Sequence, residues 1–284
     1  MQAILWMSGA LASFCGMAIG ARELSGEINT FETLFFRSLI GLLVVTTVIV
    51  SSGQFSLFKT QRLKLHTLRN AFHFGGQYGW FLGIGLLPLA EVFAIEFTVP
   101  FWTAILAAVF LGESFTWRKS LAVLLGLLGV LVIVKPGTEI FNSASLIVLV
   151  AAVAYAVSHT ATKGLASTEK PLTILFYMCL IQLPVSLLLA IPNWTVPEWV
   201  HWPWLLLVGI TALTAHFCMT KAMQSAEVSV VVTLDFIRLP LIAMIGVLLY
   251  GESVNLSLAI GGVLMLLGNL VNFYKPKNHH KIDT

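Results

Sequence analysis

The sequence predicts an all-α membrane protein whose ten transmembrane helices form two inverted repeats of five. Three observations lead to this fold class: a very apolar composition, apolar runs of membrane-spanning length from end to end, and a duplication between the two halves. Of the 284 residues, 58% are hydrophobic and only 10% are charged. Soluble domains carry roughly 25% charged residues, so this chain lacks the polar surface that a water-soluble fold requires.

Ten apolar runs are each close to the roughly 20 residues that a helix needs to cross a bilayer. They do not alternate apolar and polar residues as the strands of a membrane barrel do, so we expect helices. The first run has no preceding Lys or Arg and is needed to complete the repeat, which favours a helix over a signal peptide. The predicted spans lie near 3–21, 31–50, 68–87, 90–111, 117–134, 145–163, 171–191, 204–222, 226–249 and 256–274.

The Lys and Arg residues divide unevenly between the two sides of the predicted bundle. If the N-terminus is cytoplasmic, 12 of the 16 fall in cytoplasmic segments, two fall outside, and Arg37 and Arg238 fall within spans. Cytoplasmic loops are enriched in Lys and Arg, so both termini are predicted to be cytoplasmic. The net charge of +3 reflects this bias and requires no nucleic-acid partner. The twelve are Lys59, Arg62, Lys64, Arg69, Arg118, Lys119, Lys163, Lys170, Lys221, Lys275, Lys277 and Lys281.

The duplication is clearest in two segments. The run AEVFAIEFTVPFWTAILAAVFLGES (90–114) resembles AEVSVVVTLDFIRLPLIAMIGVLLYGES (226–253), and each is followed by one more apolar run that ends in Lys-Pro. The repeated unit holds five spans, an odd number, so the second copy must enter the membrane from the opposite side. Inverted repeats are typical of secondary transporters, which bind their solute near the bilayer midplane where the copies meet. A duplicated scaffold without transport is the alternative.

The same segments resemble a known family. The run LPLAEVFAIEFTVPFWTAILAAVFLGESFTWRKSLAVLLGLLGVLVIVKPG (87–137), preceded by FFRSLIGLL (35–43), is similar to the EamA type of the drug/metabolite transporter superfamily. The resemblance covers essentially the whole chain and implies a bacterial inner-membrane carrier of ten helices with both termini inside. Members carry amino acids, nucleotide-like metabolites, riboflavin, S-adenosylmethionine or drugs, so the family does not select the solute. The position that matches Arg37 in the second half is Tyr177, so the halves are not chemically equivalent.

We therefore expect three segments along the chain. The first repeat covers 1–137, the second covers 138–276, and a solvated cytoplasmic tail covers 277–284. The expected partners are the lipid bilayer and a small-molecule solute. No cofactor is expected, and the three cysteines lie singly in apolar spans, which suggests neither a disulfide nor a metal site.

Four charged side chains lie well inside predicted spans, away from the span ends: Arg37, Glu96, Asp235 and Arg238. A charge at the bilayer centre costs roughly 2.5–3.5 kcal/mol on insertion scales, so each should face the interior and find a partner. Arg37 and Glu96 each lie six residues into their spans from the outside, which at about 1.5 Å per residue makes them a candidate pair. Such a pair either locks two helices together or contacts the solute and gates its path. Asp235 and Arg238, spaced i and i+3, share a helix face and could neutralise each other.

Pro100 and Pro240 follow the acidic residues within two equivalent spans. A proline inside a helix removes one backbone hydrogen bond, so both positions predict helix breaks. The carbonyl that each proline frees is available to a ligand. A packed kink without a ligand is the alternative.

Two helix faces combine polar and aromatic side chains at helical spacing. One stripe on the third span is His73, Gln77 and Trp80, and another on the sixth span is Tyr155, His159 and Thr162. We interpret both stripes as the lining of a cavity that stacks on a planar ring and bonds its polar edge. His216 on the eighth span is interpreted as an ordinary hydrogen-bonded group.

The predicted function is a secondary carrier of a small organic metabolite that works by alternating access. Riboflavin, taken up by the cell, is the preferred solute because it is a planar heteroaromatic. The alternatives are S-adenosylmethionine or another nucleoside-like metabolite, and an amino acid or drug exported by a carrier of the same family. A channel and an intramembrane enzyme are rivals of other classes. The chain has no HExxH, GxSxG or Walker motif, which disfavours the enzyme.

Overall fold

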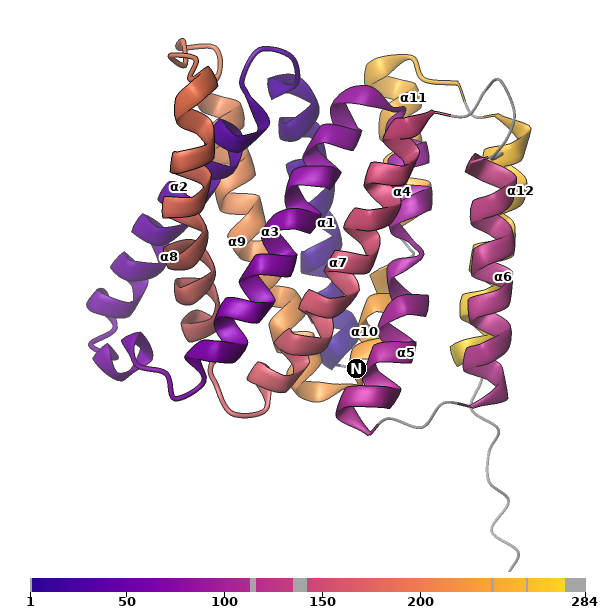
Figure 1. Ribbon diagram of the computed structural model, residues 1–284, viewed down its shortest axis with the longest axis horizontal. Coiled ribbons are helices and arrows are strands. Elements are labelled where there is room, and N and C mark those ends of the chain that lie inside the picture. The colour runs from indigo at the N-terminus through magenta and orange to yellow at the C-terminus, as the bar shows by residue number, and fades with distance from the viewer. Residues whose placement is uncertain (1, 113–115, 135–141, 236–237, 254, 274–284) are drawn as a thin grey trace, which may run out of the picture.

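The structure, a computed structural model, describes residues 2–112, 116–134, 142–235, 238–253 and 255–273. Within these ranges every regular element is helical, and the helices stand side by side as a bundle (Figure 1). The predicted tail at 277–284 and the predicted repeat boundaries at 137 and 276 lie outside the described residues.

Twelve α-helices make up the described part of the bundle. In the first half they are α1 (Gln2–Leu24), α2 (Thr30–Ser51), α3 (Leu63–Leu86), α4 (Leu89–Glu96), α5 (Val99–Leu111) and α6 (Trp117–Val134). In the second half they are α7 (Ser143–Ala166), α8 (Pro171–Ala190), α9 (Trp202–Ser225), α10 (Val228–Leu234), α11 (Arg238–Tyr250) and α12 (Leu256–Phe273). Short 3₁₀ turns, η1 (Phe55–Phe58) and η2 (Ile191–Asn193), follow α2 and α8.

Local sequence explains several helix ends. Asn29 and Asn142 cap α2 and α7, because each side-chain oxygen accepts from the backbone N–H two residues further on, at 2.9 Å. Pro171 begins α8, where its missing N–H and fixed φ suit the first helical turn. Gly112 ends α5 and Gly251 follows α11 with φ of 69° and 62°, a left-handed conformation that glycine adopts without strain.

Two of the predicted spans are broken near their middle. One break separates α4 from α5, just before Pro100. The other falls between the end of α10 at Leu234 and the start of α11 at Arg238, just before Pro240, and positions 236 and 237 there lie outside the described residues. Pro100 cannot donate a hydrogen bond to the carbonyl of Glu96 four residues back, so the helix is interrupted there. The two broken helices lie against each other, with α4 on α11 and α5 on α10. The sequence thus brings two backbone interruptions together inside the bundle.

Helices of the first half pack along helices of the second half. α1 packs on α9, α3 on α7, α2 on α8, and α6 on α12. Figure 1 shows α2 and α8 at one edge of the bundle and α6 with α12 at the other. α3 approaches α7 closely because Gly79 and Gly83 face it; a Cβ added at Gly83 would lie only 2.4 Å from Val148. This close packing brings the two predicted polar stripes near each other.

Six described helical segments are long and apolar enough to cross a membrane. α3 is not among the six although it has 24 residues, because it carries polar side chains that face the interior. α10 and α11 are not among them because each is too short by itself. The chain is therefore a multi-pass membrane protein, all-helical in its described residues, as its composition predicted. The six segments are Gln2–Leu24, Thr30–Ser51, Leu89–Leu111, Ser143–Ala166, Pro171–Asn193 and Trp202–Ser225.

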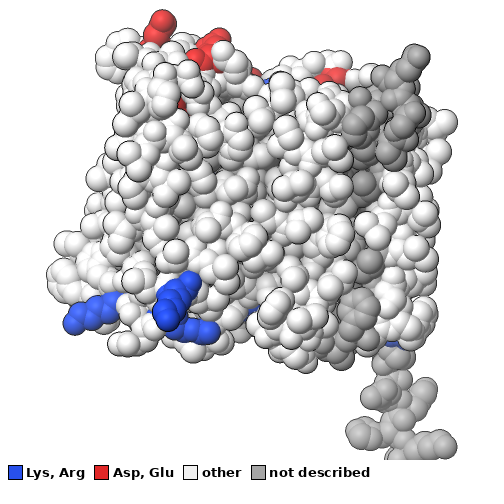
Figure 2. All heavy atoms as spheres, in the orientation of Figure 1, with Lys and Arg blue, Asp and Glu red and all other residues white. Residues whose placement is uncertain are grey.

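Charged side chains lie at the two ends of the bundle (Figure 2). On the face shown, Lys and Arg gather at the end that holds the N-terminus and the α2–α3 connection, which we call the basic end. Asp and Glu gather at the opposite end, which holds the α1–α2 turn and which we call the acidic end. Exposed side chains between them, such as Leu43, Leu188 and Leu248, are apolar. An uncharged belt of this kind suits the hydrocarbon core of a bilayer.

Candidate functional site

A narrow cavity lies in the bundle interior, where the two helix breaks meet α1, α3, α7 and α9. Its volume is about 20 Å³, which is room for about one water molecule. Sites for small organic molecules typically measure about 300–1,000 Å³, so this structure represents a closed state of the interior. The lining residues come from both halves: Phe14, Met17, Gln77, Trp80, Glu96, Tyr155, His159, His216, Met219, Asp235 and Arg238.

Arg238 joins the acidic residues of the two halves. Its Nη2 donates to Glu96 Oε1 at 2.8 Å and to Asp235 Oδ2 at 2.5 Å. Trp80 Nε1 donates to the other oxygen of Glu96 at 2.7 Å. The contact with Asp235 follows from i, i+3 spacing, whereas the contact with Glu96 crosses between halves and arises only from the fold. The cavity wall therefore carries two carboxylates around one guanidinium.

Aromatic rings surround the same guanidinium. Its central carbon lies 4.5 Å from the ring centroid of Phe14, 4.7 Å from that of Phe93 and 5.8 Å from that of Phe97. Ring faces attract a cation within about 6 Å, so these contacts stabilise Arg238 where water is scarce. The site is thus both acidic and aromatic, a combination that suits positively charged groups.

Residues that line the cavity keep three polar atoms without a hydrogen-bond partner among the described residues. These atoms are Asp235 Oδ1, Arg238 Nε and His159 Nδ1. Most buried polar atoms are bonded, and leaving one unpaired costs about 1–3 kcal/mol. An acceptor, a donor and a ring nitrogen that can take either role therefore remain for a bound molecule. This is the strongest indication in the structure that the cavity is a binding site.

The two stripes predicted from the sequence contribute four residues to this cavity. Gln77 and Trp80 come from α3, and Tyr155 and His159 come from α7. The rings of Tyr155 and His159 are nearly parallel, with an interplanar angle of 18° and centroids 6.2 Å apart. Trp80 has its N–H bound to Glu96, so it also orients that carboxylate.

A buried chain of hydrogen bonds leads from the cavity toward the basic end. His216, which lines the cavity, and His73, behind the wall, approach with their Nε2 atoms 3.2 Å apart. Gln182 contacts His73 Nδ1 at 2.9 Å and donates to Asn70 Oδ1 at 3.1 Å. Asn70 donates to the carbonyl of His66 at 2.9 Å. Sequence reasoning overlooked Gln182, although a lone amide in an apolar span is itself a signal of interior pairing.

Arg37 and Glu96 do not form the pair suggested by their equal depths. In the orientation that gives both amide atoms of Gln77 a partner, its oxygen accepts from Arg37 Nη1 and Nη2 at 2.6 and 2.7 Å. Equal depth fixes a position along the membrane normal but not the direction in which a side chain leaves its helix. α2 packs mainly on α8 and α9, whereas Glu96 faces the second break, where Arg238 binds it.

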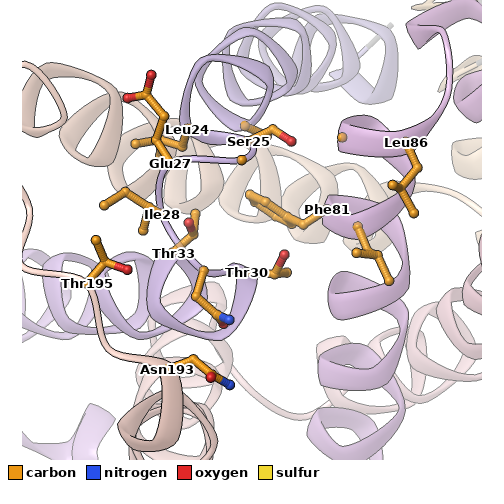
Figure 3. Close-up of a pocket in the computed structure, with 15 residues that line it drawn as sticks. Leu24, Ser25, Glu27, Ile28, Thr30, Thr33, Phe81, Leu86, Asn193 and Thr195 are labelled. Carbon is orange, nitrogen blue, oxygen red and sulfur yellow. The ribbon is translucent and has the colours of Figure 1, made fainter.

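A larger hollow opens at the acidic end (Figure 3). Its volume is about 570 Å³, and the α1–α2 turn, α3 and the α8–α9 connection line it. Figure 3 shows the polar side chains Ser25, Thr33 and Asn193 around this hollow, with Phe81 of α3 among them. Phe81 directly follows Trp80 of the cavity, so α3 contributes neighbouring residues to the hollow and to the interior site.

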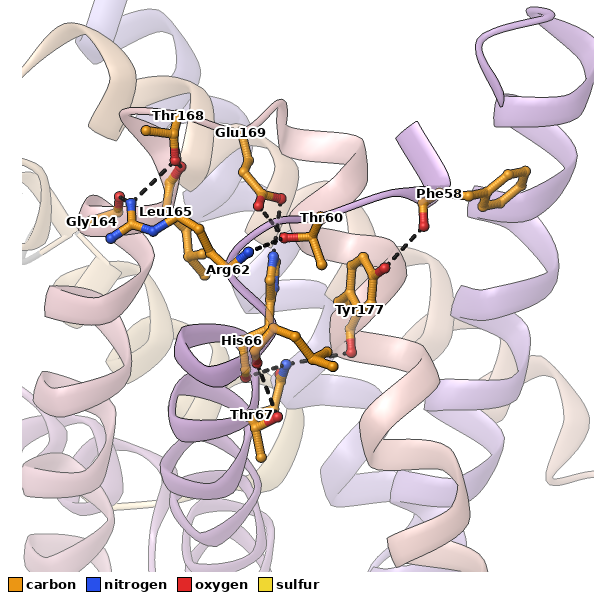
Figure 4. A network of polar contacts seen from close by, with 12 residues as sticks. Phe58, Thr60, Arg62, His66, Thr67, Gly164, Leu165, Thr168, Glu169 and Tyr177 are labelled. Atoms are coloured by element: carbon orange, nitrogen blue, oxygen red, sulfur yellow. Dashed lines mark hydrogen bonds and ion pairs between the residues drawn. The ribbon is translucent and has the colours of Figure 1, made fainter. Parts of the chain in front are cut away.

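Polar contacts close the basic end, where the α2–α3 connection meets the α7–α8 connection (Figure 4). Glu169 accepts a hydrogen bond from Thr60 Oγ1 and lies 3.0 Å from His66 Nε2. Arg62 Nη1 donates to the carbonyl of Gly164 at 2.6 Å. These contacts tie the first half to the second. The acidic end also holds ion pairs between the halves, but they leave the hollow open.

Comparisons with known proteins agree with this architecture. A profile of the EamA-like transporter family matches residues 1–135 and 142–274. The chain is 26% identical to the S-adenosylmethionine uptake transporter of Rickettsia felis, over 96% of this chain and 92% of the relative. It is 28% identical to the riboflavin transporter of Vibrio cholerae, over 94% and 91%. It is 27% identical to the pseudopaline exporter CntI of Pseudomonas aeruginosa, over 90% and 91%.

The fold is also shared with a protein of known crystal structure. That structure superposes with a TM-score of 0.73 at 20% sequence identity, over 95% of this chain and 96% of the other. Such a likeness concerns the fold alone. The family profile, in contrast, covers nearly the whole sequence, and the chain belongs to the EamA-like transporter family.

Proposed function

We propose that the protein is a secondary transporter of a small organic cation that carries an aromatic ring, with S-adenosylmethionine as the preferred solute. It crosses the bacterial inner membrane ten times, in two inverted repeats, and works by alternating access. The observation that carries the solute proposal is the cavity wall of two carboxylates around one guanidinium, with Asp235 Oδ1 left unpaired among the described residues.

Inverted repeats account for the packing of the bundle. With α4–α5 and α10–α11 counted as one span each, the first span packs on the eighth and the third on the sixth. Exchanging the halves turns one of these pairs into the other. The second, fourth and fifth spans each pack on their own counterpart in the other half. The two segments matched by the family profile coincide with the same halves.

Two basic side chains support the same relation. Arg22 in the last turn of α1 donates to two carbonyl oxygens at the end of α3, at 2.5 and 3.2 Å. Lys163 near the end of α7, the first helix of the second half, donates to two carbonyl oxygens at the end of α9, at 2.6 Å each. The first contact lies at the acidic end and the second at the basic end, as an inverted repeat requires.

The basic end is proposed to face the cytoplasm, because cytoplasmic loops are enriched in Lys and Arg. Both termini then lie inside. Reporter fusions within 59–64 should be active on the cytoplasmic side and fusions within 193–202 on the outer side. The opposite pattern would contradict the orientation.

The charge of the cavity favours S-adenosylmethionine, for which the Rickettsia relative is named. This solute carries a sulfonium cation, which acidic and aromatic groups attract, and an adenine ring, which aromatic side chains stack on. Riboflavin is the second candidate, because Trp80 and Tyr155 are aromatic and Gln77 and His159 can bond a neutral ring edge. Riboflavin carries no cationic group, so it would leave one of the two cavity carboxylates without a counter-charge.

The state seen here fits one step of alternating access. The hollow at the acidic end, about 570 Å³, is an entrance from the outside, and the contacts of Glu169 and Arg62 hold the cytoplasmic side closed. The interior cavity of about 20 Å³ must expand to admit a solute. Opening of one end with closure of the other is therefore the motion we propose.

Flux measurements with purified protein in liposomes test the solute. Labelled S-adenosylmethionine should enter with saturable kinetics, faster when the liposomes are preloaded with unlabelled solute, and riboflavin should compete only weakly. Protein-free liposomes are the control. Stronger uptake of riboflavin than of S-adenosylmethionine would reverse our choice of solute. Flux of both that never saturates would indicate a channel.

A further inference from the structure

Arg37 and Arg69 are buried cations to which the described residues supply no acid. Both are 2% exposed, and neither forms an ion pair within the described chain, whereas Arg238 reaches two carboxylates. Arg69 donates to Thr162 Oγ1 at 3.2 Å and to Asn70 Oδ1 at 2.7 Å, and both of these partners are neutral. A buried charge without a counter-ion is strongly unfavourable. This region therefore attracts an anion that the protein itself does not provide.

Gln77 occupies the place that a carboxylate would take at Arg37. Its amide oxygen accepts from Nη1 and Nη2 of Arg37, at 2.6 and 2.7 Å, and its amide nitrogen donates to Gln182 Oε1 at 2.8 Å. Guanidinium groups bind carboxylates through the same pair of nitrogens, in shorter and stronger bonds. Gln77 also lines the cavity. One neutral amide thus separates the unpaired cation from the space where the solute binds.

We propose that Arg37 is the anion subsite of this transporter. When the cavity expands, the Gln77 amide turns aside and a carboxylate of the solute takes its place on Arg37. This inference rests on the proposed function and adds that the solute is a zwitterion. Its cationic group lies near Glu96 and Asp235, and its carboxylate lies at Arg37.

The two sides of the interior have opposite charge, as a zwitterion requires. The helix breaks contribute one more carboxylate than guanidinium. On the other side, Arg37 bonds Gln77, which lines the cavity, and no described residue supplies Arg37 with an acid. S-adenosylmethionine carries its carboxylate at a different point from its sulfonium and fits this arrangement. Riboflavin has no carboxylate and does not.

The test compares S-adenosylmethionine with its decarboxylated analogue, which keeps the sulfonium, the amine and the adenosyl group. Binding of each to purified protein is measured by titration. The wild-type protein should prefer S-adenosylmethionine by about tenfold or more, because a charge-assisted pair with a carboxylate is lost in the analogue. Arg37→Gln should abolish this preference by weakening S-adenosylmethionine binding, while the analogue keeps its affinity within about twofold.

Two further variants separate the subsite from a general loss of positive charge. Arg69→Gln removes the other unpaired cation, whose hydrogen bonds reach no cavity-lining residue, and should keep the preference. Arg37→Lys keeps the positive charge but loses the planar guanidinium that can bind a carboxylate through two nitrogens, so it should keep part of the preference. Thermal unfolding of each variant verifies that it is folded.

The outcomes distinguish this inference from the proposed function. Equal wild-type affinity for both compounds overturns the subsite and leaves the proposed solute in place, and this comparison requires no variant to fold. A preference that survives in folded Arg37→Gln also overturns the subsite. Binding of neither compound by the wild-type protein overturns the subsite and the proposed solute together.

Discussion

The two broken helices share their architecture and differ in their charges. Each begins around the tripeptide AEV, is interrupted near an acidic residue and resumes in a half-helix with a proline in its first turn. The first break contributes Glu96 alone, whereas the second contributes Asp235 and Arg238. Because Arg238 binds both acids, a cation that only the second copy carries at its break is the one that joins them. The prolines that both copies share interrupt the helices, and Arg238, which only the second copy has, offsets part of the negative charge of the site.

Replacing Arg238 with a neutral residue should have the largest effect on the stability of the two broken helices. Arg238→Gln leaves two buried carboxylates without their cation and should destabilise the protein by about 3–5 kcal/mol, as for other broken buried pairs. Thermal unfolding in detergent measures the effect. Adding Glu96→Gln and Asp235→Asn should restore much of the stability without restoring transport. An unfolding temperature unchanged by Arg238→Gln alone would mean that the acids do not depend on it.

Removing an aromatic ring from the cavity should have the next largest effect. Tyr155→Ala takes away a ring on which the adenine of the solute can stack, and stacking is worth about 1–3 kcal/mol per base. The affinity for S-adenosylmethionine should fall about tenfold or more, measured by titration at equal amounts of folded protein. Trp199→Ala is the matched control, because Trp199 is 91% exposed and far from the cavity lining. Equal losses in both variants would remove Tyr155 from the site.

The acid of the first break depends on one further contact, from Trp80. Trp80→Phe keeps an aromatic side chain but removes the hydrogen bond to Glu96, so the affinity should fall about fivefold, the value of one modest hydrogen bond. Trp102→Phe is the control, because the indole N–H of Trp102 has no partner among the described residues. The idea that Trp80 orients Glu96 fails if Trp102→Phe weakens binding as much as Trp80→Phe does.

The smallest effect concerns the two basic side chains at the helix ends. Lys163→Met should loosen the basic end by about 1 kcal/mol for lost hydrogen bonds. Arg22→Met should loosen the acidic end by somewhat more, because it also removes the ion pair of Arg22 with Glu252. A single cysteine introduced as Met17→Cys, in a background without the native cysteines, reports access to the cavity in oriented vesicles. Arg22→Met should raise labelling from outside and Lys163→Met labelling from inside. A shift in the same direction for both would contradict the inverted relation.

Much of the fold follows from local sequence. Apolar runs of membrane length set the spans, and prolines such as Pro100 interrupt a helix wherever they fall, because they lack an N–H. The polar stripes were also predictable, since residues at i, i+4 and i+7 share a helix face in any tertiary context. Gln77 and Trp80 therefore reach one cavity, and so do Tyr155 and His159.

Contacts between helices were much harder to predict. Depth in the membrane suggested Arg37 as the partner of Glu96, but the rotation of each helix about its own axis decides which side chains meet. Gln182 was overlooked, and His216 was interpreted as an ordinary hydrogen-bonded group, for a related reason: only the packing of α8 and α9 brings these two residues to the interior network. Spacing along one helix cannot supply that information.

The affinity for S-adenosylmethionine of variants at the two acids tests the central claim, that one cavity between the two breaks binds a cationic solute. Glu96→Gln and Asp235→Asn should each weaken binding by about tenfold or more, because each removes a charge that attracts the sulfonium. Glu91→Gln, on the same helix as Glu96 but bonded to Ser145 outside the cavity lining, should bind as the wild type does. Wild-type affinity in a folded variant that lacks both acids would contradict the account.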